Sequence, residues 1–338
     1  MGIRIAYLAA PTTGNGFYRG IAPMMALEAR GHQVTRLPAE GAVPQDALAS
    51  LDVLHIHRYV DDRVLKLARA AKERGAAVVW DNDDDVGGIP RGTIAYRKHG
   101  GANWERRRTA MRKLFGHVDL VTAPSTYLAR RFSEDGASRT AVVENYPPDQ
   151  FLRVRVRPHD GVVVGWIAAK EHAVDVEQLE LRATLERLLN DLPELRVHTF
   201  GAGLGLRSAR YVHVDVVPLL RLTEEAAAFD VGIAPLADVG FNRARSNIKL
   251  KEYAAAGLPW LASPTGPYAG MGEKQGGRLV PDDRWYEEVR RLVEKERDRR
   301  KLQKRAVKWV AGETLERNAH RWEELFVDAV ERARAAAR

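Results

Sequence analysis

Short apolar runs alternate with amphipathic stretches along almost the whole chain, which contains 338 residues. Runs that are apolar at successive positions are typical of strands buried on both faces of a sheet. They lie at 3–9, 33–38, 52–58, 76–82, 120–125 and 141–146, and again at 162–169, 196–203, 211–217, 231–236, 259–264 and 277–280. Because helical patterns separate most of them, the sequence predicts an α/β protein with doubly wound parallel sheets.

The alternation pauses at residues 145–161, where two adjacent prolines and scattered charge replace any helical stripe. Such a stretch is typical of an interdomain hinge. A chain of this length also exceeds what one hydrophobic core ordinarily supports. We therefore expect two Rossmann-like domains in tandem, at 1–150 and 158–311, followed by a C-terminal helical segment at 312–338.

Two regions carry clear helical stripes. A helix is expected at about 171–190, with Leu179, Leu185, Leu188 and Leu189 on one face. The C-terminal region is rich in Arg, Lys and Glu, and its stripe comprises Trp309, Leu315, Trp322, Leu325, Phe326 and Val330. The interleaved glutamates favour a solvated helix that packs this stripe on the domains over a basic face for a membrane surface or a nucleic acid.

Composition and charge narrow the classes of protein and ligand. Apolar residues make up 45% and charged residues 29%, as in soluble globular proteins, and no apolar run approaches the roughly 18 residues of a membrane span. We therefore expect a cytoplasmic protein without a signal peptide. The absence of Cys excludes disulfides, thiolate catalysis and Cys-ligated zinc. The net charge of +8 favours an anionic partner, and charge alone does not choose among nucleotide, nucleic acid and lipid head group.

The loop after the first strand is rich in glycine. Ligands of an open parallel sheet bind beyond the carboxyl ends of the strands, and Gly14 and Gly16 would let the backbone approach a ligand there. Arg19 lies one turn into the next helix. The alternative is an ordinary tight turn. A dinucleotide site is disfavoured, because the acidic ribose partner expected at the end of the second strand is absent and Glu40 comes late, in a loop.

The loop at 80–86 concentrates four carboxylates, from Asp81, Asp83, Asp84 and Asp85, within five residues. Because like charges repel, this density favours a functional role. One hypothesis is a D-x-D site in which a divalent cation holds a nucleotide diphosphate. Another is a polar cluster that binds sugar hydroxyls or orients an acceptor. The structural alternative is a loop whose aspartates cap the next turn.

Two strand exits in the second half also carry candidate ligand groups. Lys170 and His172 lie where a strand gives way to a helix, so a phosphate could meet both a cation and the N–H groups of the helix start. The alternative is a surface Lys and His at that start. The Gly-rich exit at 199–206 contains Gly203 and could lie against a base or a ribose, although alone it is weak evidence.

The segment 241–259 places cations at the start of a helix, where acidic residues are usual. Ser246 is the expected N-cap, and Lys249 and Glu252 follow it on one face. A diphosphate would take the N–H groups of the helix start together with Lys249, and Glu252 would accept hydrogen bonds from a ribose diol. The alternative is a surface helix whose Lys and Glu pair locally. The other candidates in this segment are Phe241, Asn242, Arg243, Arg245 and Asn247.

The segment 229–268 resembles the donor-site signature of glycosyltransferase family 4, and the stretches at 18–32, 54–59, 78–86 and 164–175 support the resemblance. It implies the GT-B fold, in which an N-terminal acceptor domain and a C-terminal donor domain face a cleft. It also implies a hexosyltransferase that moves a sugar from a nucleoside-diphosphate sugar to a sugar, lipid or small-molecule acceptor. Transfer in that family retains the anomeric configuration and needs no metal or other cofactor.

The resemblance assigns roles to individual residues. Glu252 matches the second Glu of the family's paired motif, which binds ribose, whereas the first Glu would fall at Ala244 and is missing. Its expected substitutes at the transferred sugar are Phe241, Asn242 and Arg243. The expected diphosphate ligands are Lys170, His172, Arg245, Ser246, Asn247 and Lys249, and the residues facing acceptor and sugar are Gly14, Gly16, Asp83 and Asp84.

The family's chemistry further implies that Asp83, Asp84 and Lys249 contribute to catalysis. The departing phosphate oxygen takes the acceptor proton in that family, so no protein base is required. Acceptor recognition is expected in loops of the first domain, notably 84–105.

Two other classes of function stay open. The missing first Glu allows a non-catalytic nucleotide-sugar-binding or scaffold protein of the same fold. A nucleic-acid binder is disfavoured, because the Arg residues are dispersed among Glu and no aromatic-basic platform is present. Weak peripheral contact with a membrane is a further alternative. The sequence identifies neither the base and sugar of the donor nor the acceptor.

Overall fold

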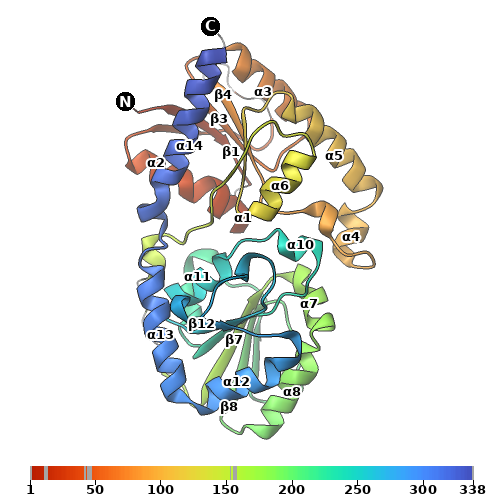
Figure 1. Cartoon of the computed structure of the whole chain (residues 1–338), viewed down its shortest axis with the longest axis vertical. Helices are drawn as coiled ribbons and strands as arrows, with labels where there is room; N and C mark the ends of the chain where they lie inside the picture. The colour runs from red at the N-terminus through yellow and green to blue at the C-terminus, as the bar shows by residue number, and fades with distance from the viewer. Residues whose placement is uncertain are drawn as a thin grey trace. The chain divides into compact units, whose positions relative to one another are not determined.

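The computed structural model describes residues 2–10, 14–41, 43, 48–152, 154 and 158–336. The side chain of Lys170 lies outside that description. The chain divides into two compact units, and Figure 1 shows a sheet with helices in each. Unit 1 comprises Met1–Tyr146, Arg243–Ser246 and Leu315–Arg338, and unit 2 comprises Pro147–Asn242 and Asn247–Thr314.

Unit 1 contains, within the described residues, a six-stranded parallel sheet with the order β2-β1-β3-β4-β5-β6. Its strands are β1 Arg4–Leu8, β2 Gln33–Arg36, β3 Val53–His57, β4 Ala77–Asp81, β5 Leu120–Ala123 and β6 Thr140–Val142. The central strands β3, β4 and β5 are buried at every position, which explains why they read as continuous apolar runs. The predicted doubly wound sheet is confirmed here.

The helices of unit 1 cover both faces of this sheet. They are α1 Gly14–Gly16, the π-helical turn η1 Phe17–Ile21, α2 Ala22–Ala29, α3 Asp62–Glu73, the 3₁₀ turn η3 Val86–Gly88, α4 Ile94–His99, α5 Ala102–Phe115, α6 Thr126–Glu134 and α14 Leu315–Ala336. Side chains of α3, α5 and α6 share one core cluster, while α2 and α14 share another with the opposite face. The C-terminal helix therefore uses its apolar stripe to complete unit 1.

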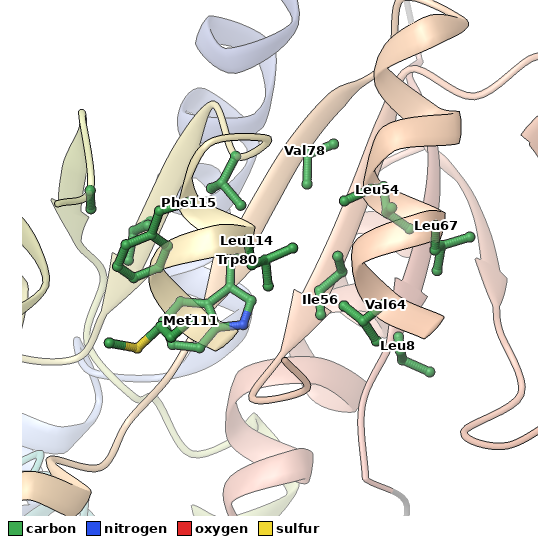
Figure 2. Packing of buried hydrophobic residues seen from close by; sticks show 14 of the residues in the cluster. Leu8, Leu54, Ile56, Val64, Leu67, Val78, Trp80, Met111, Leu114 and Phe115 are labelled. Atoms are coloured by element: carbon green, nitrogen blue, oxygen red, sulfur yellow. The ribbon is translucent and has the colours of Figure 1, made fainter. Parts of the chain in front are cut away.

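Trp80 on β4 is the centre of the core beneath α5 and α6, and Figure 2 shows it among the buried side chains of this face. Its ring meets Phe115 and Phe132 edge-on, at centroid distances of 5.4 and 5.2 Å. Complete burial of an aromatic side chain contributes about 1.5–3 kcal/mol, and such edge contacts add to it. This packing fixes the carboxyl end of β4, where the Asp-rich loop begins.

Unit 2 repeats the architecture with the strand order β12-β11-β10-β7-β8-β9, all parallel, in the part of the chain that the structure describes. The strands are β7 Val162–Ala168, β8 Leu195–Gly201, β9 Tyr211–Val214, β10 Val231–Ala234, β11 Trp260–Ala262 and β12 Gly277–Leu279. The helices are α7 Ala173–Gln178, α8 Leu181–Asp191, α9 Leu222–Ala226, α10 Gly240–Arg243, α11 Ile248–Ala255, α12 Trp285–Glu294 and α13 Glu296–Val310. Short 3₁₀ turns are η4 Asp149–Leu152, η5 Lys170–His172, η6 Leu219–Arg221, η7 Gly266–Tyr268, η8 Glu273–Gln275 and η9 Asp282–Arg284.

The single helix predicted at about 171–190 is wrong. Glu180 adopts a left-handed backbone with φ 46°, which ends α7 after Gln178 and lets α8 begin at Leu181. The apolar stripe continues across this break, because Leu179, Leu185 and Leu188 are all buried, so periodicity alone did not reveal it. No helix in the described ranges is long and apolar enough to cross a membrane.

Candidate functional site

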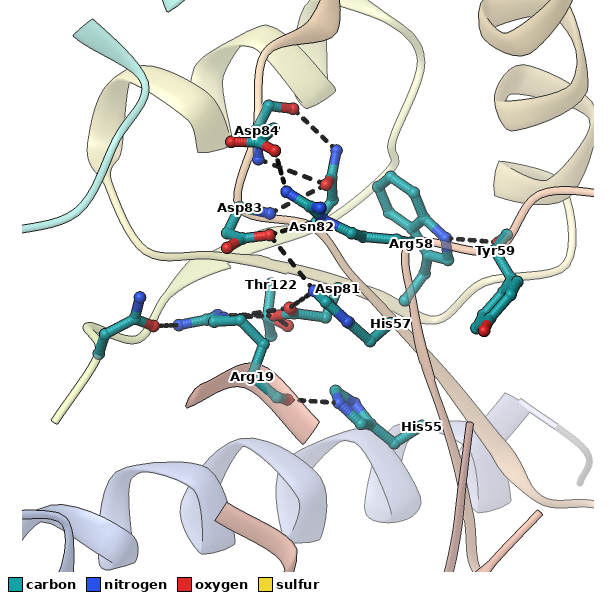
Figure 3. Close-up of polar contacts among 12 residues, drawn as sticks. Arg19, His55, His57, Arg58, Tyr59, Asp81, Asn82, Asp83, Asp84 and Thr122 are labelled. Atoms are coloured by element: carbon teal, nitrogen blue, oxygen red, sulfur yellow. Dashed lines mark hydrogen bonds and ion pairs between the residues drawn. The ribbon is translucent and has the colours of Figure 1, made fainter. Parts of the chain in front are cut away.

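Arg19 and Asp81 form a fully buried ion pair at the carboxyl end of β4. Nη2 of Arg19 lies 2.6 Å from Oδ2 of Asp81, and its Nε lies 3.0 Å from Oδ1. Nη1 donates to the carbonyl of Val143 and to the side chain of Asn145, and the Thr122 hydroxyl donates to Asp81 over 2.6 Å. Figure 3 shows the guanidinium and the carboxylate facing each other inside unit 1. Arg19 is therefore a structural residue that anchors η1 to the sheet.

The other three carboxylates of the Asp-rich loop have partners as well. Arg58 donates from Nε to Oδ1 of Asp83 over 2.8 Å, and its Nη2 pairs with Asp84. Asp85 accepts from the backbone N–H of Gly88 over 3.2 Å and caps η3. Of the aspartates in this loop, only Asp85 caps the following turn, which was the structural alternative for all of them. The partners explain how the loop tolerates so much negative charge, and the described residues contain no group of three or more acidic or His side chains suited to a metal ion.

Arg58 holds this position with an unusual backbone. Its φ of 69° lies in the left-handed region, which costs a residue with a Cβ about 1–2 kcal/mol. The Arg58 N–H donates to the carbonyl of Asp81 over 2.9 Å, and Trp80 Nε1 donates to the carbonyl of Tyr59 over 3.0 Å, so the bonds on both sides of Arg58 fix the turn. Strain that the surrounding structure maintains in this way is typical of functional sites.

The electrostatics keep Asp83 ionised. Burial raises the pKa of Asp83, but the charge of Arg58 and the hydrogen bond from His57, 3.3 Å from Asp83 Oδ1, outweigh burial and hold that pKa far below its ordinary value. At Asp85 the balance is reversed, and burial raises the pKa of that carboxyl despite the charge of Arg131. An ionised carboxylate of this kind accepts hydrogen bonds and is too weak a base to remove the proton of a hydroxyl group.

His55 on β3 is buried beside this network and is neutral. Burial lowers the pKa of His55 to about 4, although the charge of Asp81 opposes that shift. Its Nε2 lies 3.0 Å from the carbonyl oxygen of Arg19, so Nε2 carries the proton. Nδ1 is buried and has no hydrogen-bond partner among the described residues.

Gly14 and Gly16 form α1, just before η1, and the preceding residues 11–13 lie outside the described ranges. A Cβ added to Gly14 would meet nothing within 4 Å, so packing does not require glycine there. Gly16 is buried in unit 1. The structure therefore places both glycines beyond the carboxyl end of β1, as expected.

In unit 2, Asp175 is the centre of a buried network at the carboxyl ends of β7 and β10. Its Oδ1 accepts from the backbone N–H of Ala237 over 2.8 Å and from the Asn242 side chain over 2.7 Å. Its Oδ2 lies 2.6 Å from Nδ1 of His172. Asn242 also donates to the carbonyl of Ala237. The predicted residues His172 and Asn242 are thus brought together by Asp175, while the backbone of Lys170 lies in η5 and its side chain lies outside the description.

A cavity of about 560 Å³ opens beside Gly203, at the carboxyl ends of β8 and β9. Its lining residues are Ala173, Val176, Glu177, Arg182, Gly201, Ala202, Gly203, His213 and Asp215. Two carboxylates, a guanidinium and an imidazole give it polar groups that can fix the orientation of a ligand. A Cβ on Gly203 would lie 3.1 Å from Nε2 of His213, so glycine leaves room at this wall.

Lys249 and Glu252 pair with each other on α11. Nζ of Lys249 lies 2.7 Å from Oε2 of Glu252, and the Glu252 side chain is only 3% exposed. The helix is not an amphipathic surface helix, because every residue from Leu250 to Ala255 is buried. Tyr253 on the same helix donates to the carbonyl of Ile233 and accepts from the N–H of Ile167, which fixes α11 on the sheet.

The prediction that Ser246 caps this helix is wrong. The N-cap is Asn247, without a side-chain bond to the helix, and the Ser246 hydroxyl instead accepts from Nδ2 of Asn145 in unit 1 over 3.0 Å. Arg245 also belongs to unit 1 and is half-buried. Phe241 is buried in α10. Arg245 and Phe241 remain predicted contacts of the donor.

Comparison of the fold with solved structures places this geometry in a known architecture. A glycosyltransferase from Rickettsia africae ESF-5 superposes with a TM-score of 0.68 at 12% identity, over 97% of this chain and 99% of that one. Anabaena Alr3699/HepE in complex with UDP gives 0.66 at 14% identity, over 96% and 100%. The chain has the GT-B fold. A putative UDP-N-acetylglucosamine 2-epimerase from Listeria monocytogenes is more distant, with a TM-score of 0.55 at 11% identity over 94% of each chain.

No protein-family model matches the sequence, and no curated protein matches it. The similarity is therefore one of fold. The contacts of Arg58 and Asp175 were not predicted from the sequence, although both residues lie in stretches that carried the resemblance. Their partners are distant in the sequence. Asp175 accepts hydrogen bonds from residues 62 and 67 positions away, and Arg58 donates to Asp83, 25 positions away.

Proposed function

We propose that this protein is a glycosyltransferase that moves a sugar from a nucleoside-diphosphate sugar to a hydroxyl group of an acceptor. The observation that carries the proposal is the cavity beside Gly203, at the carboxyl edge of the second sheet, where an open parallel sheet binds ligands. The GT-B fold supports it, since HepE was solved with UDP and also with UDP and glucose. We propose a donor of that chemical class here.

The cavity is proposed to take the nucleoside, with Gly201 and Gly203 against its flat surface and Glu177 or Asp215 facing its hydroxyl or N–H groups. Lys249 is proposed to meet the diphosphate. Its side chain is 21% exposed and is held by Glu252, so the ammonium is oriented before a ligand arrives. Glu252 would accept a hydrogen bond from the ribose, Lys170 would add positive charge near the phosphates, and the imidazole of His172, held by Asp175, would add a hydrogen-bonding group there.

We propose that transfer retains the anomeric configuration. The bond between the anomeric carbon and the diphosphate oxygen breaks, the acceptor oxygen bonds to the same face, and the acceptor proton passes to the departing phosphate oxygen. Negative charge grows on the diphosphate during this step, so a cation at Lys249 stabilises the transition state more than the bound donor. Asp83, ionised by Arg58, would orient hydroxyl groups and not act as the base.

A thermal-shift screen of the full chain tests the donor assignment. UDP, GDP, ADP, dTDP and CDP are compared, with and without magnesium, on the wild type, on Lys249→Ala and on the control Lys308→Ala, which changes an exposed cation of α13. One nucleotide should stabilise the wild type and the control by several degrees and Lys249→Ala much less. The absence of a shift with every nucleotide would contradict the proposal.

A non-catalytic nucleotide-sugar-binding protein is the second candidate. The observation that favours it is Ala244, fully buried where the resembled family carries a Glu. Turnover separates the two. A transferase should release the nucleoside diphosphate from its sugar donor slowly with water and faster with an acceptor, whereas the second candidate should bind the donor and leave it intact.

A further inference from the structure

Arg107 on α5 lies directly beside the strained Arg58. Its Nη2 donates to the backbone carbonyl of Arg58 over 2.7 Å, and its side chain is half-buried. That bond brings a second guanidinium to the edge of the loop whose carboxylates Arg58 orders. The position belongs to unit 1, at the carboxyl ends of β3 and β4.

Arg107 differs from its neighbours on α5 in the groups that it contacts. Arg108 pairs with Asp135 over 2.6 Å, and Arg106 contacts the side-chain oxygen of Asn103. Across the part of the chain that the structure describes, the one hydrogen bond of Arg107 goes to a neutral carbonyl, and no carboxylate lies within ion-pair distance. A partly desolvated guanidinium without an anion is costly, and it binds an incoming oxyanion strongly.

Other basic groups lie close enough to Arg107 to affect one another. Burial lowers the pKa of Arg107, and the charge of Arg58 lowers it further, while Asp84 opposes the shift. Burial also lowers the pKa of His99 at the end of α4, followed by the charges of Lys98 and Arg107. Arg58, Arg107 and Lys98 bring three positive charges to this corner, against the two negative charges of Asp83 and Asp84, so one positive charge is not offset.

We propose that Arg107, together with Lys98 and His99, binds an oxyanion, a phosphate or a carboxylate, on the acceptor substrate. The inference rests on the proposed function and narrows it, because the acceptor becomes an anionic, hydroxyl-bearing molecule. The planar guanidinium of Arg107 can take two oxygens of such a group. Arg58 connects the two groups, because its side chain donates to Asp83 and its carbonyl accepts from Arg107. Asp83 then accepts a hydrogen bond from a hydroxyl group of the same acceptor molecule.

The direct test is binding of small probes to the full chain, followed by NMR saturation transfer and calorimetry. Glucose 6-phosphate and glucuronate carry the two oxyanions, and glucose is the neutral control. Both anions, or one of them, should bind at least about tenfold more tightly than glucose, and the stronger probe identifies the source of the charge. Arg107→Gln should remove this preference and leave the weak binding of glucose unchanged, while Arg107→Lys should restore part of it.

Arg106→Gln is the matched control, since it removes one positive charge from the adjacent position, outside the proposed site. It should keep the preference for the anionic probes. Equal binding of glucose and both anions by the wild type would overturn the inference, as would the same loss in Arg106→Gln and Arg107→Gln. The thermal-shift screen with nucleotides tests the donor separately. If no nucleotide stabilises the protein while anionic sugars bind in the Arg107-dependent way, the oxyanion site is supported and the transferase proposal is contradicted.

Discussion

Arg19 and Asp81, 62 residues apart in the sequence, join η1 to β4 through an ion pair in which neither side chain is exposed. The Arg19 guanidinium also lies 4.8 Å from the ring of Trp322 on α14. Three segments that are distant in sequence therefore meet at one buried charge. The pair places the glycine loop, the Asp-rich loop and the C-terminal helix in fixed positions within unit 1.

Replacing Arg19 with Met should destabilise the protein by about 3–5 kcal/mol, because Asp81 would stay buried without its counter-charge. Urea unfolding followed by circular dichroism measures the change in the free energy of unfolding. The double variant Arg19→Met with Asp81→Leu should recover part of the loss, since it removes both buried charges of the pair. The exposed pair of Arg290 and Glu294, separated by 2.8 Å, is the control and should cost less than about 1 kcal/mol when broken.

Arg58→Gly should fold and should lose at least about tenfold in kcat/KM, a loss of about 1.4 kcal/mol of transition-state stabilisation. Glycine accepts the left-handed backbone at this position without strain, but both ion pairs to Asp83 and Asp84 disappear. The kcat/KM of Arg58→Lys should lie between those of the wild type and Arg58→Gly, because an ammonium cannot bridge two carboxylates as a guanidinium does. Glu180→Gly relieves the same backbone strain at an exposed position and should keep full activity. Full activity in Arg58→Gly would remove Arg58 from the mechanism.

The fold was largely predictable because its signal in the sequence is local. Parallel strands buried on both faces must be apolar at successive positions, so β3, β4 and β7 are recognisable as continuous apolar runs. The break at Glu180 is not recognisable in this way, because it depends on one backbone dihedral angle inside an unbroken apolar stripe. Likewise, Ser246 is a good cap by residue type, but Asn145 competes for its hydroxyl.

The candidate site was only partly predictable for the same reason. The density of aspartates marked the loop after β4, but the sequence could not say which cation each carboxylate meets. Asp83 and Asp84 depend on Arg58, and Asp81 depends on Arg19, through contacts that span 25, 26 and 62 positions. Such pairings follow from the topology of the sheet, which brings the ends of distant strands together.

His55 should make folding stability depend on pH. Its pKa is about 4 in the folded protein and 6.5 when unperturbed, so the unfolded chain binds a proton first as pH falls. The stability contributed by neutral His55 is complete above pH 6.5 and is lost progressively between 6.5 and about 4. At 1.36 kcal/mol per pKa unit, the loss is about 3 kcal/mol. Urea unfolding at intervals across this range measures it.

Two variants serve as controls, and the pH dependence of their folding stability is compared with that of the wild type. His55→Gln can still donate to the Arg19 carbonyl, and its stability should fall less steeply with pH than that of the wild type. His320→Gln, at a partly exposed position on α14, should keep the steep dependence. Parallel curves for the wild type and His55→Gln would show that other groups cause the loss.

Gly203→Val should weaken nucleotide binding at least about tenfold with little change in stability, because a branched side chain fills part of the proposed nucleoside cavity. The first carbon alone would crowd His213, which then has to move. Calorimetric titration with the nucleotide that the thermal screen selects gives the affinity. Gly272→Ala adds a Cβ where nothing lies within 4 Å and serves as the control. Unchanged affinity in Gly203→Val would place the nucleoside elsewhere.

Removal of divalent cations tests the role of the Asp-rich loop. Transfer should keep most of its rate in EDTA, because Arg58 neutralises Asp83 and Asp84 and leaves no set of free carboxylates to hold a cation in this part of the described chain. The charge on the leaving diphosphate would instead be offset by Lys249, so Lys249→Ala should lose more than about tenfold in turnover with or without metal. Complete loss in EDTA followed by rescue with manganese would reverse this assignment. In that case Asp83 and Asp84 would have to break their ion pairs with Arg58 to bind the cation. Arg58→Lys, in which these ion pairs are weaker, should then bind manganese more tightly than the wild type.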